Sequence, residues 1–435
     1  MKKTAPIFLS SVFALCLYLS GMNVYGQIPD GYGEDAYKEI DALIEGKDFF
    51  RARDLYRKNE DRLTELHRLK SGFFLNNVFN RPDSCIHKMN MLLDKHGNEI
   101  SDSLKFRLLS IGHVNYSKIY NYRKAKETLA LLLSEYEHWL SDAEEQDYKN
   151  TLAIWTALEN QPGQQIELNS TVNLKIARDK AKLQNLLVSL EGEEQYFVFD
   201  TGANLSTITE TAARRFGLKY LPGTVEVDAI TGNEIRSRIA IAPRLHLGSL
   251  TVRNAVFLVF PDEALAFPEI DYQIHGIIGF PVIEGMKEIE ITRDDRFIVP
   301  DKRSTFSERN LAIDFLTPLI YLKDKTGTGT YTFDTGAMST MLYDTYYRKN
   351  KKELDDTYRE EEVTIGGAGG LISKKGMYIT FTPEIGQKQI SMDSVIVLRE
   401  ALKKDNPYLG NIGQDLMAKF EKVTFNFEDM FIRFD

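Results

Sequence analysis

The sequence predicts an α+β multidomain protein, in which an N-terminal all-α domain of helical hairpins precedes a bilobal all-β unit. Three observations support this prediction. Apolar residues recur at helical spacing from about residue 33 to 160, short strand-like runs follow from residue 164, and the strand-rich part repeats itself at an offset of 134 residues. Since helices and strands have different apolar periods, the change of period marks a border between two kinds of domain.

The first residues are typical of a secretory signal peptide. Lys2 and Lys3 form a short basic region, an apolar run covers residues 6–20, and Gly26 supplies a small residue for cleavage. A transmembrane anchor is the alternative, but the apolar run is short for a bilayer span. We therefore predict a signal peptide at residues 1–26 and an exported protein with no stable membrane span after cleavage.

Composition limits the partners of the mature chain. Loss of residues 1–26 removes two lysines and no acids, so the formal net charge changes from −9 to −11. An acidic chain without a basic block has no evident means of binding nucleic acid. Cys85 is then the only cysteine, so no intrachain disulfide is possible, and we expect a small buried residue rather than a thiol nucleophile.

Residues 27–160 are predicted to form the helical domain. Helices are expected at 37–44, 49–56, 85–93 and 125–133. Aligning Ala52, Cys85 and Ala125 gives steps of 33 and 40 residues, which resemble degenerate tetratricopeptide-like repeats with a period of about 34 residues. An ordinary helical bundle is the other interpretation. Either could dock a protein partner, present a substrate or cover a cleft.

The composition changes at residues 161–165, where Pro and Gly end the helical pattern. Partly alternating runs follow at 165–168, 186–190 and 196–199, and similar runs return at 319–322 and 331–333. We predict two β-rich lobes at residues 164–300 and 308–435, joined by the hydrophilic stretch 300–305.

The most specific motif is a repeated Asp-Thr-Gly. It occurs at Asp200 and Asp334, each time after a run that ends in Phe, and a second glycine follows 79 positions later at Gly279 and Gly413. An Asp that merely caps a turn could account for one copy, but it does not account for the matched glycines. The repeat therefore predicts two halves of one folding unit, each presenting one carboxylate.

These residue types suit acid–base hydrolysis. Two carboxylates about 3 Å apart cannot both ionise, so they share one proton. The ionised member would take a proton from an attacking water, and the protonated member would polarise the peptide carbonyl and later protonate the leaving amine. No metal or other cofactor is required, and the seven histidines include no HExxH motif or Cys/His cluster.

Residues 200–206 and 334–340 resemble the Asp-Thr-Gly-Ala motif of the retropepsin-like aspartic protease family. Residues 277–279 and 411–413 resemble its hydrophobic-hydrophobic-Gly element. The resemblance covers about 270 residues and implies a bilobal retropepsin/pepsin-like β fold, with both lobes in one chain, so that no dimer is needed. It implies catalytic roles for Asp200 and Asp334; loop support by Thr201, Gly202, Ser206, Thr335, Gly336 and Thr340; substrate binding by Ala203, Asn204, Ala337 and Met338; and structural roles for Ile278, Gly279, Ile412 and Gly413.

Family members close a β-hairpin flap over the substrate, and each lobe has a candidate segment. One covers residues 225–235 with Thr231 and Gly232 at its turn, and the other covers residues 363–372 with Gly366 and Gly367. We expect these four residues to contact substrate, and the glycines to permit tight turns and motion. A flexible surface loop is the alternative for the second segment.

The chain departs from the family pattern at two positions near the motifs. Met338 stands where a polar residue usually contacts the substrate backbone, and Asn411 replaces an aliphatic residue. Ala203 and Ala337 lack the hydroxyl that pepsins carry there, so we expect a less acidic pH optimum than pepsin's. None of these changes removes a catalytic group.

Three functional classes follow. The favoured one is an exported aspartic endopeptidase that acts on a peptide or protein substrate. The others are a non-catalytic peptide-binding module and a scaffold whose helical repeats carry the function, and the presence of both Asp200 and Asp334 argues against them. A leader, a helical domain and a double retropepsin-like lobe together resemble bacterial envelope proteins, so we expect the periplasm or the extracellular space.

Overall fold

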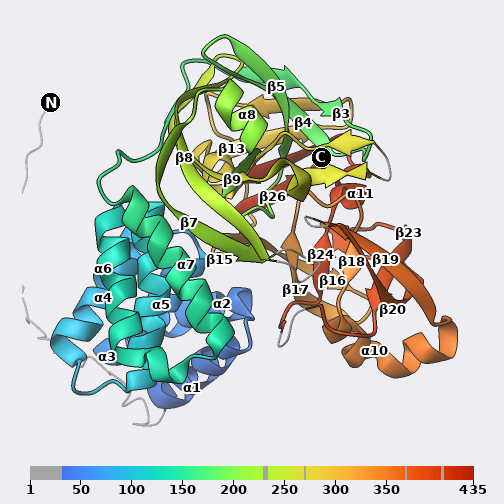
Figure 1. Cartoon of the computed structure of the whole chain (residues 1–435). Coiled ribbons are helices and arrows are strands. Elements are labelled where there is room, and N and C mark those ends of the chain that lie inside the picture. The colour runs from blue at the N-terminus through green and yellow to red at the C-terminus, as the bar shows by residue number, and fades with distance from the viewer. Residues whose placement is uncertain (1–31, 229–233, 269–270, 368–369, 403–405) are drawn as a thin grey trace, which may run out of the picture.

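The computed structural model describes residues 32–228, 234–268, 271–367, 370–402 and 406–435. The predicted signal peptide and the predicted turn at Thr231 and Gly232 lie outside these ranges. Within them, no helix is long and apolar enough to cross a membrane. The predicted fold class is confirmed: helices come first, and several β-sheets follow (Figure 1).

Seven α-helices form the N-terminal part of the described chain. They are α1 (Tyr32–Glu45), α2 (Phe49–Asn59), α3 (Glu65–Val78), α4 (Pro82–His96), α5 (Asp102–Lys118), α6 (Tyr122–Tyr136) and α7 (Asp142–Leu158). Short polar side chains cap several helix starts by accepting a backbone N–H, and these are Asp48, Thr64, Ser101, Asn121 and Ser141. Helix boundaries therefore follow from local sequence.

A small residue occupies the fourth position of α2, α4 and α6. These residues are Ala52, Cys85 and Ala125, and each side chain is 0% exposed. Small side chains let neighbouring helices approach closely. The tetratricopeptide-like repeat and the ordinary helical bundle both stay predictions. Burial raises the pKa of the Cys85 thiol, so Cys85 is the buried apolar residue that the sequence suggested.

The first lobe is built on a nine-stranded sheet in the described residues, in the order β1-β9-β6-β12-β5-β4-β8-β7 with β3 beside β4. Its strands are β1 (Gln165–Glu167), β3 (Ala177–Arg178), β4 (Gln184–Leu190), β5 (Glu193–Phe199), β6 (Ser206–Thr209), β7 (Lys219–Asp228), β8 (Glu234–Leu247), β9 (Leu250–Phe260) and β12 (Gly276–Ile278). Two short helices, α8 (Glu210–Arg215) and α9 (Phe280–Gly285), and a small hairpin of β10 (Ala266–Phe267) and β11 (Tyr272–Gln273) complete it.

The second lobe carries a ten-stranded sheet in the described residues, in the order β19-β20-β23-β18-β24-β17-β16-β21-β22 with β15 beside β16. Its strands are β15 (Leu311–Asp314), β16 (Thr317–Asp324), β17 (Gly327–Phe333), β18 (Met341–Leu342), β19 (Glu361–Gly367), β20 (Gly370–Phe381), β21 (Glu384–Ile385), β22 (Lys388–Gln389), β23 (Met392–Leu398) and β24 (Gly410–Ile412). Helices α10 (Asp344–Thr357) and α11 (Gln414–Met417) belong to the same lobe.

A third sheet joins the lobes, and the sequence did not predict it. Its order is β2-β14-β13-β25-β26, with β2 (Val172–Lys175), β13 (Glu288–Thr292) and β14 (Arg296–Val299) from the first half and β25 (Lys422–Asn426) and β26 (Phe431–Phe434) from the second. At its centre β13 and β25 are antiparallel, and Glu290 faces Thr424. These two residues are 134 positions apart, so a local two-fold axis of the repeat passes between them.

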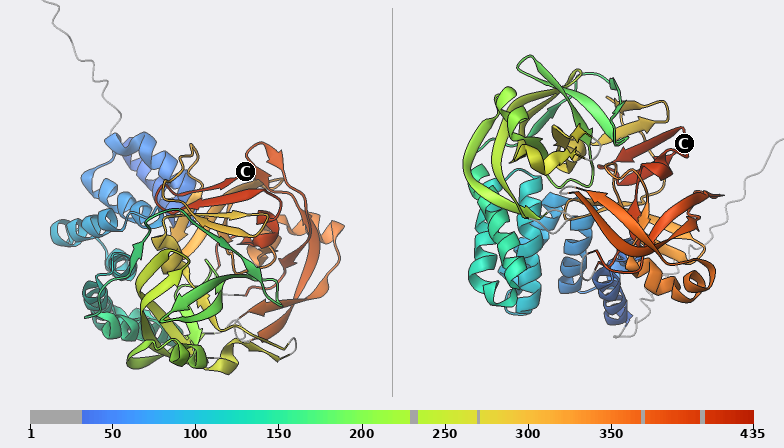
Figure 2. Two further views of the ribbon diagram at one scale, coloured as in Figure 1. Left: turned by 90° about the horizontal axis from the view of Figure 1, so that it is seen from above. Right: turned by 45° about the vertical axis from the view of Figure 1, so that its right-hand side comes forward.

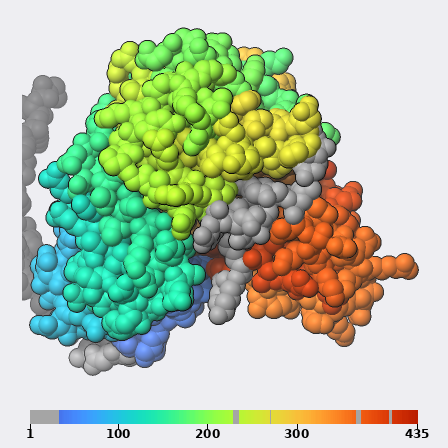
Figure 3. Space-filling view, viewed as in Figure 1, coloured from blue at the N-terminus to red at the C-terminus, as the bar shows by residue number. Residues whose placement is uncertain are grey.

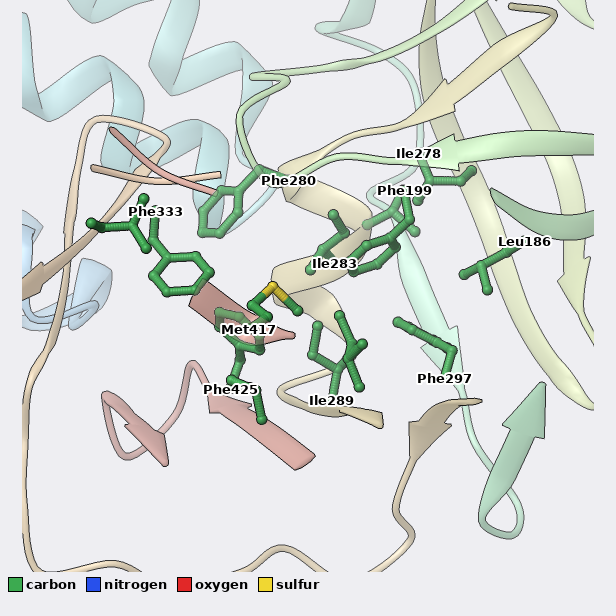
Figure 4. Close-up of a cluster of buried hydrophobic side chains, with 14 of the residues drawn as sticks. Leu186, Phe199, Ile278, Phe280, Ile283, Ile289, Phe297, Phe333, Met417 and Phe425 are labelled. Atoms are coloured by element: carbon green, nitrogen blue, oxygen red, sulfur yellow. The ribbon is translucent and has the colours of Figure 1, made fainter. Parts of the chain in front are cut away.

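One hydrophobic core contains residues of both halves of the repeat, and Figure 4 shows part of it, with Phe199 and Phe297 from the first half and Phe333 and Phe425 from the second. Phe199 and Phe333, which precede the two aspartates, are each 1% exposed. Their rings pack against Phe297 and Phe425 with centroids 4.8 and 5.0 Å apart. Aromatic packing of this kind fixes the end of each motif strand.

The helical domain touches both lobes. Helix α7 packs against β7 of the first lobe, where Trp155, Leu158 and Val225 share a buried cluster. Figure 2 shows the blue-green helices beside the yellow-green strands of that lobe. On the other side, Phe50 of α2 stacks on Tyr321 of β16, with ring centroids 4.9 Å apart. In Figure 3 the helices and the first lobe form a continuous surface, and the second lobe stands across a hollow from the helices.

Candidate active site

Each motif aspartate directly follows a buried strand. Asp200 follows β5 and Asp334 follows β17, and their backbone N–H groups donate to the carbonyl oxygens of Ile278 and Ile412, at 3.1 and 2.9 Å. Strand β12 runs parallel to β5, as β24 does to β17. The hydrophobic-hydrophobic-Gly segments thus lie beside the motif loops.

The two downstream glycines fit tightly against the motif loops. A Cβ on Gly279 would lie 2.5 Å from the backbone carbon of Leu205, and one on Gly413 would lie 2.8 Å from the carbonyl oxygen of Ala337. Real Cβ atoms do not approach backbone so closely, so any larger residue would push the loop away. The Gly279 N–H also donates to Ser206 Oγ at 3.0 Å. The Gly413 N–H likewise donates to Thr340 Oγ1, at 3.1 Å.

Reciprocal hydrogen bonds join the two motif loops. The Thr201 N–H donates to Thr335 Oγ1 at 3.0 Å, and the Thr335 N–H donates to Thr201 Oγ1 at 3.0 Å. Each hydroxyl in turn donates across the axis, Thr201 to the Phe333 carbonyl at 3.2 Å and Thr335 to the Phe199 carbonyl at 3.3 Å. Since both side chains are buried, these four hydrogen bonds satisfy two N–H groups, two hydroxyls and two carbonyls without water.

This cross-bonding brings Asp200 and Asp334 together. A Cβ on Gly202 would lie 2.7 Å from the carboxyl carbon of Asp334, and one on Gly336 would collide with the carboxyl of Asp200. Each glycine is therefore required by the carboxyl of the other loop. The same glycines hold their own aspartates, because Gly202 N–H donates to Asp200 Oδ1 at 2.7 Å and Gly336 N–H to Asp334 Oδ1 at 2.8 Å.

The carboxyl pair perturbs its own ionisation. Burial raises the pKa of Asp200 well above its usual value, and the negative charge of Asp334 and a side-chain hydrogen bond with Asp334 raise it further. Hydrogen bonds from the backbone of Gly202 and Ala203 act in the opposite direction. The site thus favours a state with one proton on the pair.

The residues expected to bind substrate lie around this pair. Asn204 and Met338 are exposed, with Met338 at 47%. The carbonyl oxygens of Ala203 and Ala337 accept the N–H groups of Phe280 and Gln414 at 2.8 and 2.9 Å, so both alanines also anchor their loops. Contact with substrate remains a prediction for all four residues.

The two expected flap segments are antiparallel hairpins. In the first lobe β7 pairs with β8, although Thr231 and Gly232 lie outside the described residues. In the second lobe β19 pairs with β20, where Gly366 faces Leu371 and Gly367 faces Gly370. Their role in holding substrate stays a prediction.

Sequence reasoning missed several groups that support the second loop. Gln414 donates from Nε2 to the Thr335 carbonyl at 2.7 Å and accepts from Arg178 at 2.6 Å, so the first lobe reaches behind the second loop. Asp415 accepts from the Thr340 N–H and hydroxyl at 2.9 and 2.6 Å. No local motif marks these residues, because their partners are distant in sequence.

Asn411 was noticed in the sequence only as a departure from the family pattern. Its Nδ2 donates to Asp334 Oδ2 at 3.2 Å, and Thr332 Oγ1 donates to its Oδ1 at 2.6 Å. The repeat places Asn411 opposite Ile277 and Thr332 opposite Val198, so a comparison of the two halves could have found this polar pair.

In the part of the chain that the structure describes, no group of three or more His, Cys, Asp and Glu side chains could hold a metal ion. The expectation that the site needs no cofactor remains a prediction from the chemistry of paired carboxyls.

Comparison with known proteins agrees with this geometry. Residues 186–282 match the aspartyl protease family. The matched segment begins in β4, contains Asp200 and ends in α9, so it spans the first motif loop and the glycine beneath it. It supports an aspartic protease-like family and a protease-like function. No curated protein gives a significant match to the chain.

Proposed function

We propose that the protein is an exported aspartic endopeptidase that hydrolyses peptide bonds with a water activated by Asp200 and Asp334. The observation that carries this proposal is the reciprocal bonding of Thr201 and Thr335, which joins the two motif loops and brings the carboxyls together. The family match over residues 186–282 supports the same reaction class.

The mechanism follows from the ionisation of the pair. With one proton shared, the ionised carboxyl accepts a proton from a water while that water's oxygen attacks the peptide carbonyl carbon. The protonated carboxyl donates its proton to the carbonyl oxygen, giving a tetrahedral gem-diol. A proton then passes to the amide nitrogen, the C–N bond breaks, and a carboxylic acid and an amine leave.

The activity is tested with a mixed-peptide library from pH 3 to 8, with cleavage read by mass spectrometry. Wild type is compared with Asp200→Asn and Asp334→Asn, which remove one ionisable carboxyl each and keep the side-chain size. Asp356→Asn is the matched control, because Asp356 is exposed on α10. We expect cleavage by wild type and the control, and none by either site variant. Absence of cleavage by folded wild type at every pH would contradict the proposal and favour a peptide-binding role.

Export is proposed from residues 1–26 alone. Expression of the full chain in a bacterial host, followed by fractionation and N-terminal sequencing, should give a periplasmic or secreted protein that begins at Gln27. A cytoplasmic product that retains Met1 would contradict it.

A further inference from the structure

Among the differences between the two halves of the site is one matched pair of neighbouring positions beside a carboxyl. In the first lobe Ile277 of β12 is the register partner of Val198 of β5, and both side chains are aliphatic. In the second lobe Asn411 of β24 is the register partner of Thr332 of β17, and both are polar. Each residue is offset from its counterpart by 134 positions, so a polar pair in one lobe stands where the other lobe has an aliphatic pair.

This polar pair reaches one carboxyl. Thr332 Oγ1 lies 2.6 Å from Asn411 Oδ1, and Asn411 Nδ2 lies 3.2 Å from Asp334 Oδ2. Thr332 Oγ1 also lies 3.2 Å from the Gly410 carbonyl oxygen, but its approach to the amide oxygen is the shorter one. With the hydroxyl donating to the amide oxygen, the NH₂ group faces the carboxyl. Tyr343 also hydrogen-bonds Thr332, so the chain of contacts runs Tyr343–Thr332–Asn411–Asp334.

Asp200 has no counterpart of this donor among the described residues. Its carboxyl accepts from the backbone groups of Gly202 and Ala203, and the matched side chain on its side, Ile277, cannot donate. Asp334 accepts from the Gly336 N–H and from the Asn411 amide. Each carboxyl thus has two donors among the described residues, and Asp334 is the one whose second donor is a side-chain amide. A donor to a carboxylate stabilises its ionised form, so removal of the Asn411 amide takes that stabilisation from Asp334 alone.

We propose that Asn411 is a positioning residue that keeps Asp334 as the ionised member of the pair and leaves the shared proton on Asp200. This assignment rests on the proposed peptidase activity and deepens it. Asp334 is then the base that accepts the proton of the attacking water. Asp200 is the acid that protonates the carbonyl oxygen. Asp334 then gives its proton to the amide nitrogen as the C–N bond breaks, and a hydroxyl of the gem-diol returns a proton to Asp200, which leaves a carboxylic acid, an amine and the pair in its starting state.

Other titratable groups around Asp334 do not reproduce this effect. Tyr343 is the titratable residue that contacts Thr332 of β17. Burial raises the pKa of its hydroxyl, so Tyr343 stays neutral. Asp415, beyond the loop, is bonded to Thr340, and a negative charge there would disfavour an ionised Asp334. Arg178 is separated from the loop by Gln414 and pairs with Asp295 at 2.8 Å.

The kinetic test compares Asn411→Leu, which removes the amide and keeps the branched shape of the side chain, with Ile277→Leu at the matched position. kcat/KM is measured against pH on a peptide that wild type cleaves. The acid limb is the part of the kcat/KM profile in which activity falls as the pH is lowered. Because Asn411→Leu removes a hydrogen bond to a charged group, we expect it to shift this limb to higher pH by about one unit. Ile277→Leu should leave the limb where wild type has it. An acid limb that does not move in Asn411→Leu would overturn the assignment. A shift of the limb to lower pH would also overturn it, because it would show that the amide oxygen faces a protonated Asp334.

Exchanging the residues of the two lobes gives a stronger test. The double variant Ile277→Asn with Asn411→Ile gives the donor to the Asp200 side. With the donor present on one side only, we expect the acid limb to return toward the wild-type pH, whereas a mere packing role for Asn411 predicts no rescue.

A melting experiment tests Asn411 without any activity. In the Asp200→Asn variant, Asp334 is the one ionisable carboxyl left in the pair. Its contribution to stability is the difference in melting temperature between Asp200→Asn and the double variant Asp200→Asn/Asp334→Asn, measured across pH. We expect Asn411→Leu to move the midpoint of that difference upward by about one pH unit. If the protein cleaves no peptide but Asn411→Leu shifts the midpoint, the proposed function is refuted and the role of Asn411 stands. If the midpoint does not shift, the role of Asn411 is refuted and the proposed function is not.

Discussion

At the scale of single residues, the site depends on groups that satisfy one another across the repeat axis. Thr201 and Thr335 each supply a hydroxyl to the other loop, and Gly202 and Gly336 each leave room for the other loop's carboxyl. A change on one side therefore leaves a buried group unpaired on the other side.

Replacing Thr201 or Thr335 with Val tests this dependence. Val keeps the shape but removes the hydroxyl, so a buried N–H and a buried carbonyl lose their partners. We expect each variant to lower the free energy of unfolding by about 1–3 kcal/mol per unpaired group, measured by thermal and denaturant unfolding. The control is Thr380→Val, since Thr380 is exposed. Equal stability of the Thr201 variant and this control would contradict the account.

The carboxyl pair also predicts how stability depends on pH. Burial and the charge of Asp334 raise the pKa of Asp200 in the folded protein. The folded state thus holds this proton more tightly than the unfolded state, whose Asp pKa is about 3.9. This contribution to stability is complete below that pH and is lost as the pH rises through the folded pKa.

Asp200→Asn removes the ionisation, so it should melt at a higher temperature than wild type at about pH 7 to 8. The difference should shrink toward about pH 4, where the wild-type carboxyl is protonated in both states. Melting curves across this range measure it, with Asp356→Asn as the exposed control. A variant that is less stable than wild type at neutral pH would show that the raised pKa has another origin.

At the scale of elements, the first hairpin differs from the second in what supports it. Strand β7 rests on α7, where Val225 shares a buried cluster with Trp155, and the Glu226 N–H donates to Asn150 Oδ1 at 3.2 Å. The second hairpin, β19–β20, packs within its own lobe, with Val363 and Ile365 in a separate cluster. The helical domain is therefore placed to influence one flap candidate.

Val225→Asp tests this contact. A carboxylate in that buried cluster costs free energy, so β7 should separate from α7 and its backbone amides should exchange faster with deuterated solvent. Exchange in β19–β20 should not change. Thr224→Asp is the matched control on the neighbouring, exposed position. Unaltered exchange in β7 and β8 of the Val225 variant would contradict support by α7.

At the scale of the whole molecule, the sequence predicted the order of the domains and the repeat, because both can be recognised from the spacing of residues within short segments. The helix and strand periods marked the border near residue 161, and the offset of 134 residues located both motif loops. The third sheet was missed, since the pairing of Glu290 with Thr424 joins strands from different lobes. Arg178 and Gln414 were missed for the same reason, because their contact spans 236 positions.

The central claim is that two loops from two lobes form one chemical unit. It is tested most directly by kcat/KM for Asp200→Asn, Asp334→Asn and the double variant on one cleaved peptide. If the carboxyls act together, the double variant should be no slower than either single variant, because each change alone already disables the pair. Losses that multiply in the double variant, or a single variant with wild-type activity, would contradict the account.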